Sequence, residues 1–359
     1  MLELRESFVC VKNITLTGSK LLAGDRDSNT YIHVKKNMAS IFKEFVTMID
    51  SGIVDDIDML KDDYRKIAKQ MDAKGFFKTS KKPKGSFNEI NSYARIIYKK
   101  EFSIKQKANK NNYLENLLYF VSIIGMMWFV LYSRSFLNRQ FDIHSLSMPM
   151  VLACVFIVPV SVYLFHEAGH YIAASLLGVP VASLQIGFFI TYPTVFLTYR
   201  GLNLNTALKK VSILLGGAAG HMAGIVIGIV LMRCGVYNTF IDVWIIGNTS
   251  MIFVNLSVFG ATDGYYIITT LLGIYNLRLL GYSAIKKVLH RQAPGKKEAA
   301  YGAVLLVLWT LSFCGIYESI KMNTSYFNIP PDITFTISIV LIVLLIVRFI
   351  YKTYNLKLQ

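Results

Sequence analysis

Residues 149–174 read PMVLACVFIVPVSVYLFHEAGHYIAA, and they decide how the rest of the chain is interpreted. An α-helix needs about 20 apolar residues to cross the ~30 Å hydrocarbon layer of a membrane. This run is long enough, yet it carries His166, Glu167 and His170 near its end. Ionisable side chains are costly at membrane depth and mark functional sites. The stretch therefore predicts a transmembrane helix that contains a chemical site.

The other long apolar runs predict further membrane spans. They lie at 116–133, 211–232, 241–260, 300–317 and 333–351. Only 17% of the residues are charged, against about 25% in soluble domains. We expect an α-helical polytopic membrane protein of about six transmembrane helices within residues 114–359. The first 113 residues are hydrophilic, so no signal peptide is expected.

The net charge of +16 first suggests nucleic acid or an anionic membrane as a partner. Residues 1–77 are neutral, however, and residues 78–113 and 114–359 carry +8 each. If the N-terminus is cytoplasmic, twelve Lys and Arg near helix ends face the cytoplasm and four face outside. The charge therefore predicts a multi-pass protein of the cell membrane with both termini cytoplasmic, and it argues against nucleic acid as a partner.

The motif His-Glu-x-x-His is typical of zinc hydrolases. His166 and His170 are four residues apart, so both imidazoles lie on one helix face and can reach one Zn²⁺. Glu167 can then accept a proton from the water that the metal activates. A polar cluster between helices and a proton relay are the alternatives for these three residues.

A third ligand is expected from a later helix. Glu167 and Asp263 are the two acidic residues of 114–359 that we expect at membrane depth. Asp263 follows the predicted span 241–260, which runs in the same direction as 149–174. His170 and Asp263 should therefore lie at similar depth, and two His plus one carboxylate form a catalytic zinc set.

These residues resemble the site-2 protease family of intramembrane zinc metalloproteases. That family often carries Asn-Leu-x-Pro-x-x-x-Leu-Asp-Gly on the later helix, and Asn255 and Asp263 keep its eight-residue spacing. Val258 and Thr262 depart from the pattern. The resemblance covers roughly residues 149–275. The resemblance implies that zinc is bound by His166, His170 and Asp263. It also implies that Glu167 is the general base.

Two further residues are candidates for substrate or oxyanion binding. Glycines at a spacing of four, Gly216 to Gly228, predict a ridge for close helix packing. In the resembling family a Gly-Pro-x-x-Asn segment often lies here, and His221 would stand at the position of its Asn. His221 could then bind the oxyanion or substrate, or be a satisfied core residue. Asn255 has the same candidate roles, or supports the ligands.

Residues 179–200 are rich in β-branched and aromatic side chains and predict short strands or a re-entrant hairpin. An edge strand there could pair with an extended substrate, although a purely structural hairpin is an alternative.

Residues 1–77 predict a small α+β domain of winged-helix type. Strands are expected near Phe8–Val11 and at 31–34, and helices over 37–50 and 53–71. This order resembles the PqqD-like recognition element of ribosomally synthesised, modified peptides (RiPPs). The resemblance implies binding of a leader peptide at a sheet edge, and a plain scaffold domain is the alternative. Residues 78–113 are expected to form a basic juxtamembrane linker, with 87–104 lying along anionic lipid or only fixing topology.

The sequence thus favours an intramembrane zinc metalloprotease that cleaves a membrane-associated peptide or protein. Maturation or release of a RiPP is the first expectation for its role. The alternatives are cleavage of a membrane-anchored regulator, and a non-catalytic transporter or immunity protein.

Overall fold

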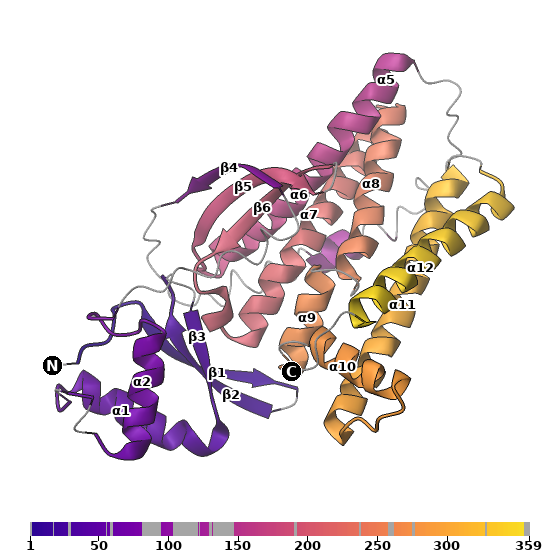
Figure 1. The fold of residues 1–359 in the computed structure, drawn as a ribbon. Coiled ribbons are helices and arrows are strands. Elements are labelled where there is room, and N and C mark those ends of the chain that lie inside the picture. The colour runs from indigo at the N-terminus through magenta and orange to yellow at the C-terminus, as the bar shows by residue number, and fades with distance from the viewer. Residues whose placement is uncertain are drawn as a thin grey trace. The chain divides into compact units, whose positions relative to one another are not determined.

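The computed structural model describes fifteen stretches of the chain. They are residues 2–16, 18–27, 30–54, 56–57, 60–80, 95–102, 121, 123–128, 131, 147–189, 192–236, 238–257, 262–274, 277–326 and 329–354. The chain forms two compact units (Figure 1). Unit 1 contains 1–113, 171–213 and 271–273, and unit 2 contains 114–170, 214–270 and 274–359.

Unit 1 begins with an antiparallel three-stranded sheet, in the order β1 (Phe8–Thr15), β2 (Gly18–Asp25) and β3 (Thr30–Val34). Sequence reasoning predicted β1 and β3 but missed β2. A 3₁₀ turn, η1 (Lys36–Met38), leads into α1 (Ala39–Asp50), which matches the predicted helix 37–50. The small α+β domain is thus confirmed, and its winged-helix assignment stays a prediction.

The second helix of this domain is shorter than predicted. Helix α2 spans Asp62–Ala73, whereas the periodic pattern suggested a start at residue 53. Asp62 and Asp63 occupy its first turn, where negative charge stabilises a helix N-terminus. The core beneath the helices is apolar and contains Phe42, Phe45, Met71, Phe76 and Phe77, all at most 1% exposed.

A second antiparallel sheet in unit 1 has the order β4 (Arg95–Glu101), β5 (Val181–Phe189) and β6 (Tyr192–Tyr199). The predicted hairpin at 179–200 is confirmed as β5 and β6, whose register pairs Val181 with Tyr199. Part of the predicted linker, 95–101, instead forms β4 against β5. Its Ile and Tyr residues favour a strand, and its partner lies too far away in sequence for a local pattern to reveal. Residues 81–94 and 103–113 lie outside the described residues.

The described residues hold four helices that are long and apolar enough to cross a membrane, which indicates membrane association. They are Met148–Leu176, Ala207–Arg233 (α7), Thr239–Leu256 (α8) and Lys296–Gly315. The first combines α5 (Met148–Leu152), a π-helical segment η4 (Ala153–Ile157) and α6 (Val158–Leu176). Pro159 lacks an N–H and would clash with the carbonyl four residues back. The wider π-helical turn before it keeps the helix continuous.

Further helices are α9 (Asp263–Leu272), α10 (Leu277–Leu289), α11 (Lys296–Tyr326) and α12 (Pro331–Tyr354), with a 3₁₀ turn η5 at Leu202–Leu204. The predicted span 333–351 lies on α12, a helix of 24 residues that includes the apolar stretch Pro331–Leu344. The predicted span 116–133 falls mostly outside the described residues. The count of six transmembrane helices stays a prediction.

The predicted glycine ridge on α7 packs against two helices, α6 and α8, which run beside it (Figure 1). A Cβ on Gly220 would overlap the carbonyl of Phe165 in α6. A Cβ on Gly228 would lie 2.5 Å from Cγ1 of Ile245 in α8. The packing role of the ridge is therefore confirmed.

Candidate functional site

Three of the predicted site residues meet in unit 2. The ligand atoms of His166, His170 and Asp263 all lie within 4.8 Å of one another. The two Nε2 atoms are 3.1 Å apart. Asp263 Oδ2 lies 3.4 Å from Nε2 of His166 and 3.2 Å from Nε2 of His170. The structure thus brings together the two halves of the motif and the distant carboxylate.

The local folding of two segments explains this convergence. The two histidines are four residues apart on continuous α6, so they share one face of that helix. The sequence predicted that Asp263 lies at the end of the span 241–260. Instead, α8 ends at Leu256, and Asp263 is the first residue of α9. The next residue must be small, because a Cβ on Gly264 would overlap the carbonyl of Leu256. The Asp-Gly pair therefore lets α9 begin close against the end of α8.

Gly217 on α7 makes room for the imidazoles. A Cβ built at this position would lie 2.6 Å from Nδ1 of His166 and 2.7 Å from Nε2 of His170. Cβ atoms essentially never approach other heavy atoms this closely. The two histidine residues are buried, with exposures of 8% and 7%. Glycine at 217 is thus a steric condition for the site.

The donor set fits a small divalent metal. Within the described residues, the buried Oδ2 of Asp263 receives no hydrogen bond, although it faces two imidazole nitrogens. Ligand atoms at about 2.1 Å from a tetrahedral Zn²⁺ are about 3.4 Å from one another. The three observed separations, 3.1, 3.2 and 3.4 Å, are close to that value. Two imidazoles and one carboxylate are also the ligand types that catalytic zinc sites use.

The remaining predicted residues lie at or beside this cluster. Glu167 follows His166 on α6 and is half-buried. His221 on α7 is completely buried, and its Nε2 lies 3.1 Å from Nδ1 of His166. Asn255 on α8 places Nδ2 3.1 Å from Nε2 of His221 and 3.2 Å from Nδ1 of His166. All six candidate residues therefore belong to one neighbourhood within unit 2.

Sequence reasoning missed Asn248, which lies on the far side of His221. Its Oδ1 is 3.1 Å from Nδ1 of His221, and its Nδ2 donates to the carbonyl of Trp244 at 2.9 Å. The side chain is completely buried. The available signal was an amide in the middle of the apolar span 241–260, where a polar group needs a partner.

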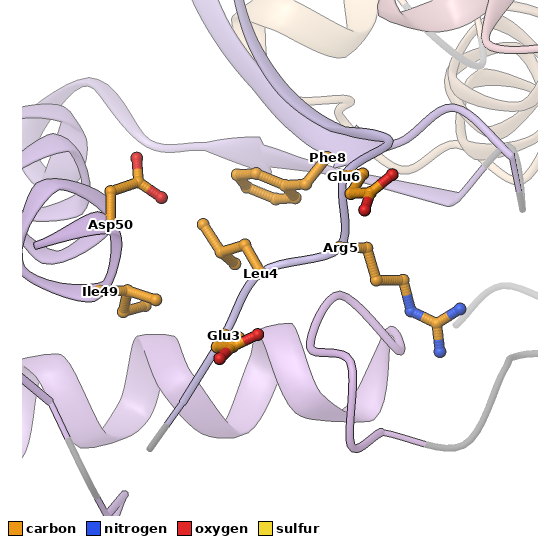
Figure 2. A pocket seen from close by; sticks show the side chains of 7 residues that line it. All are labelled: Glu3, Leu4, Arg5, Glu6, Phe8, Ile49 and Asp50. Atoms are coloured by element: carbon orange, nitrogen blue, oxygen red, sulfur yellow. The ribbon is translucent and has the colours of Figure 1, made fainter. Parts of the chain in front are cut away.

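Unit 1 contains a separate pocket of about 400 Å³ in the N-terminal domain (Figure 2). Leu4, Phe8 and Ile49 lie together in it, while the Arg5 side chain points away from them. The Arg5 guanidinium donates to the carbonyls of Phe77 and Ser80, at 3.1 and 2.9 Å. Glu3, Glu6 and Asp50 complete the lining. The pocket therefore combines apolar side chains with carboxylates.

No family model, curated protein or solved structure matches this chain. The candidate metal site is consequently defined by the chain's own residues: two imidazoles and a carboxylate, held by α6 and α9 at separations that suit one metal ion.

Proposed function

We propose that this chain is an intramembrane zinc metalloprotease of the site-2 protease type. One observation carries the proposal: the convergence of His166 Nε2, His170 Nε2 and Asp263 Oδ2 at near-tetrahedral separations. Two of these residues lie on a helix of membrane-spanning length. Buried polar groups of this kind are expensive in a membrane protein and are kept for function.

The chemistry proposed is hydrolysis of a peptide bond. A bound Zn²⁺ supplies Lewis acidity to a water molecule and to the substrate carbonyl. His166, His170 and Asp263 would hold the ion, each through one ligand atom. The Glu167 carboxylate accepts a proton from the attacking water and passes it to the nitrogen of the leaving amine. The burial of the histidines keeps bulk water from competing with these groups.

The substrate proposed is a membrane-associated peptide or protein, and first a ribosomally synthesised, modified peptide that the enzyme matures or releases. The N-terminal domain supports this choice, because β1 and β3 are the edges of its sheet and an extended leader peptide binds at a sheet edge. The β6 edge of the second sheet offers a similar surface to an unwound substrate. In this proposal the protein is multi-pass in the cell membrane, with both termini cytoplasmic and its basic residues near anionic lipid.

The test is cleavage of candidate precursor peptides by the purified full chain, with zinc content measured in parallel. We expect Glu167→Gln to keep its zinc and lose cleavage by a factor of at least ~10², the scale of general-base catalysis. His170→Ala and Asp263→Ala should lose zinc. Thr310→Val, on α11, is the matched control and should change neither quantity.

Two outcomes would contradict the proposal. Cleavage by Glu167→Gln at the wild-type rate would remove the general base. A wild-type chain that takes up no zinc, or that keeps it after Asp263→Ala, would favour a transporter or immunity protein with a polar cluster in place of the metal site.

A further inference from the structure

We propose that Asn248 and His221 set the tautomer of His166, so that its Nε2 presents a lone pair to the metal before the metal binds. The inference rests on the metal site of the proposed function and adds two positioning residues to it. Its basis is a series of four hydrogen-bonding groups in unit 2, which runs from the backbone carbonyl of Trp244 on α8 to the imidazole of His166 on α6.

The direction of the hydrogen bonds in this series of groups is set by the carbonyl of Trp244, which can only accept a hydrogen bond. Asn248 Nδ2 donates to it at 2.9 Å. An amide side chain has one donor group and one acceptor, so the Asn248 Oδ1 is turned toward α7. There it lies 3.1 Å from Nδ1 of His221.

Since Oδ1 is an acceptor, Nδ1 of His221 must carry the proton. Burial favours the neutral form of an imidazole, which has a single N–H. Its Nε2 is therefore an acceptor. The amide Nδ2 of Asn255 can only donate, and it lies 3.1 Å from Nε2 of His221 and 3.2 Å from Nδ1 of His166. In the proposed arrangement it donates to Nε2 of His221.

The last step sets the tautomer of the His166 imidazole. Its Nδ1 lies 3.1 Å from the accepting Nε2 of His221, so Nδ1 carries the proton and Nε2 does not. Nε2 is the atom that faces His170 and Asp263. Metal-binding histidines commonly donate their other N–H to a partner that fixes ring and tautomer. Here the His221 imidazole is such a partner, and the backbone carbonyl of Gly217 is a further acceptor for the His166 ring.

Burial makes the arrangement depend on these residues. His221 and Asn248 are both 0% exposed, so water cannot easily replace either side chain. A Cβ on Gly224 would lie 2.9 Å from the Asn248 Oδ1, so the amide fits because α7 has a glycine there. Complete burial behind His166 also favours positioning over the direct substrate or oxyanion contact that the sequence suggested for His221.

The experiment compares zinc affinity and histidine tautomer in the full chain. Zinc affinity is measured by competition with a chelator, and the tautomer of His166 by ¹⁵N NMR of the metal-free, histidine-labelled protein. We expect His166 to be protonated at Nδ1 in the wild type. His221→Phe should mix its tautomers and weaken zinc binding by about 10- to 100-fold.

Three variants separate positioning from mere packing. His221→Gln keeps an acceptor and a donor and should retain most of the affinity. Asn248→Leu removes the acceptor for His221 and should weaken zinc binding even if His221→Phe does not fold. Thr249→Val, whose hydroxyl donates to the carbonyl of Ile245, is the matched control on α8 and should bind zinc like the wild type.

Wild-type zinc affinity in both His221→Phe and Asn248→Leu, or an unchanged His166 tautomer in them, would overturn this proposal while leaving the proposed function intact. A wild-type chain without zinc would instead overturn the proposed function, and this inference with it.

Discussion

At the residue scale, the absence of one Cβ controls whether the site can form. Gly217 lies against both imidazoles, and any side chain there would occupy the space of His166 and His170. Both rings are held in a packed interior, so they cannot move away without cost. A glycine that looks like a packing residue in the sequence is thus part of the geometry of the candidate metal site.

We predict that Gly217→Ala lowers zinc affinity by at least ~10-fold, as expected when the ligands of a metal are displaced. Zinc content and competition with a chelator measure the effect. Gly315→Ala, on α11, is the matched control, because a Cβ added there would meet nothing within 4 Å. Equal zinc affinity in the two variants would mean that the rings move aside freely.

The residues of the candidate metal site could be predicted from sequence because each obeys a local rule. His166 and His170 need only the helical repeat, and Asp263 follows from its rarity at membrane depth and from its spacing to Asn255. Asn248 could not be predicted in the same way, because its role depends on which helix faces α8. That pairing is tertiary, and the sequence contains no local trace of it.

At the element scale, the ridge of α7 contains glycines with different neighbours. Gly220 meets the backbone of α6 at Phe165, whereas Gly228 meets the side chain of Ile245 on α8. A backbone cannot shift without moving its helix, while a side chain can change its rotamer. Substitution of Gly220 and substitution of Gly228 should therefore lower the stability of the fold by different amounts.

We predict that Gly220→Ala destabilises the fold by about 1–3 kcal/mol or more, the usual cost of overpacking. Gly228→Ala should cost less, because Ile245 can give way and alanine favours a helix. Thermal unfolding in detergent measures both, with Gly315→Ala as the common control. The reverse order of stabilities would show that α6 moves more easily than Ile245 repacks.

Strand β4, which forms by pairing with a distant segment, was one of the elements that sequence patterns missed. Residues 95–101 read RIIYKKE, a short apolar run between basic residues, which is equally typical of a membrane-surface segment and of a strand. Only the partner β5, which pairs Lys99 with Gln185, selects the strand. The hairpin of β5 and β6 was predictable because its two strands are neighbours in the sequence.

At the scale of the whole molecule, unit 1 joins the N-terminal domain to segments that follow it by about 200 residues. Asn13 of β1 is 2% exposed, and its Oδ1 accepts from the backbone N–H of Ala207, the first residue of α7, at 2.7 Å. Leu16 N donates to the carbonyl of Leu271 at 2.9 Å. Lys20 Nζ donates to the carbonyl of Gly273 at 2.5 Å. The N-terminal domain is therefore part of a larger compact unit.

We predict that Asn13→Ala costs about 1 kcal/mol of stability, because it leaves an orphan N–H at the start of α7 without its acceptor. Asn13→Asp keeps an acceptor and adds negative charge at a helix N-terminus. Its free energy of unfolding should therefore stay within a few tenths of a kcal/mol of the wild-type value. Chemical denaturation of the full chain measures both. A cost as large for Asp as for Ala would show that the amide group of Asn13 has a second, separate role.

The same hydrogen bond has a consequence for the order of synthesis. Asn13 and Ala207 are 194 positions apart, so β1 leaves the ribosome long before α7 does. N-terminal domains generally fold while the rest of a chain is still being made. The acceptor for the first turn of α7 is then already in place when that helix emerges. The N-terminal domain would thus act as an internal template that sets where this helix starts, in addition to any peptide that it binds.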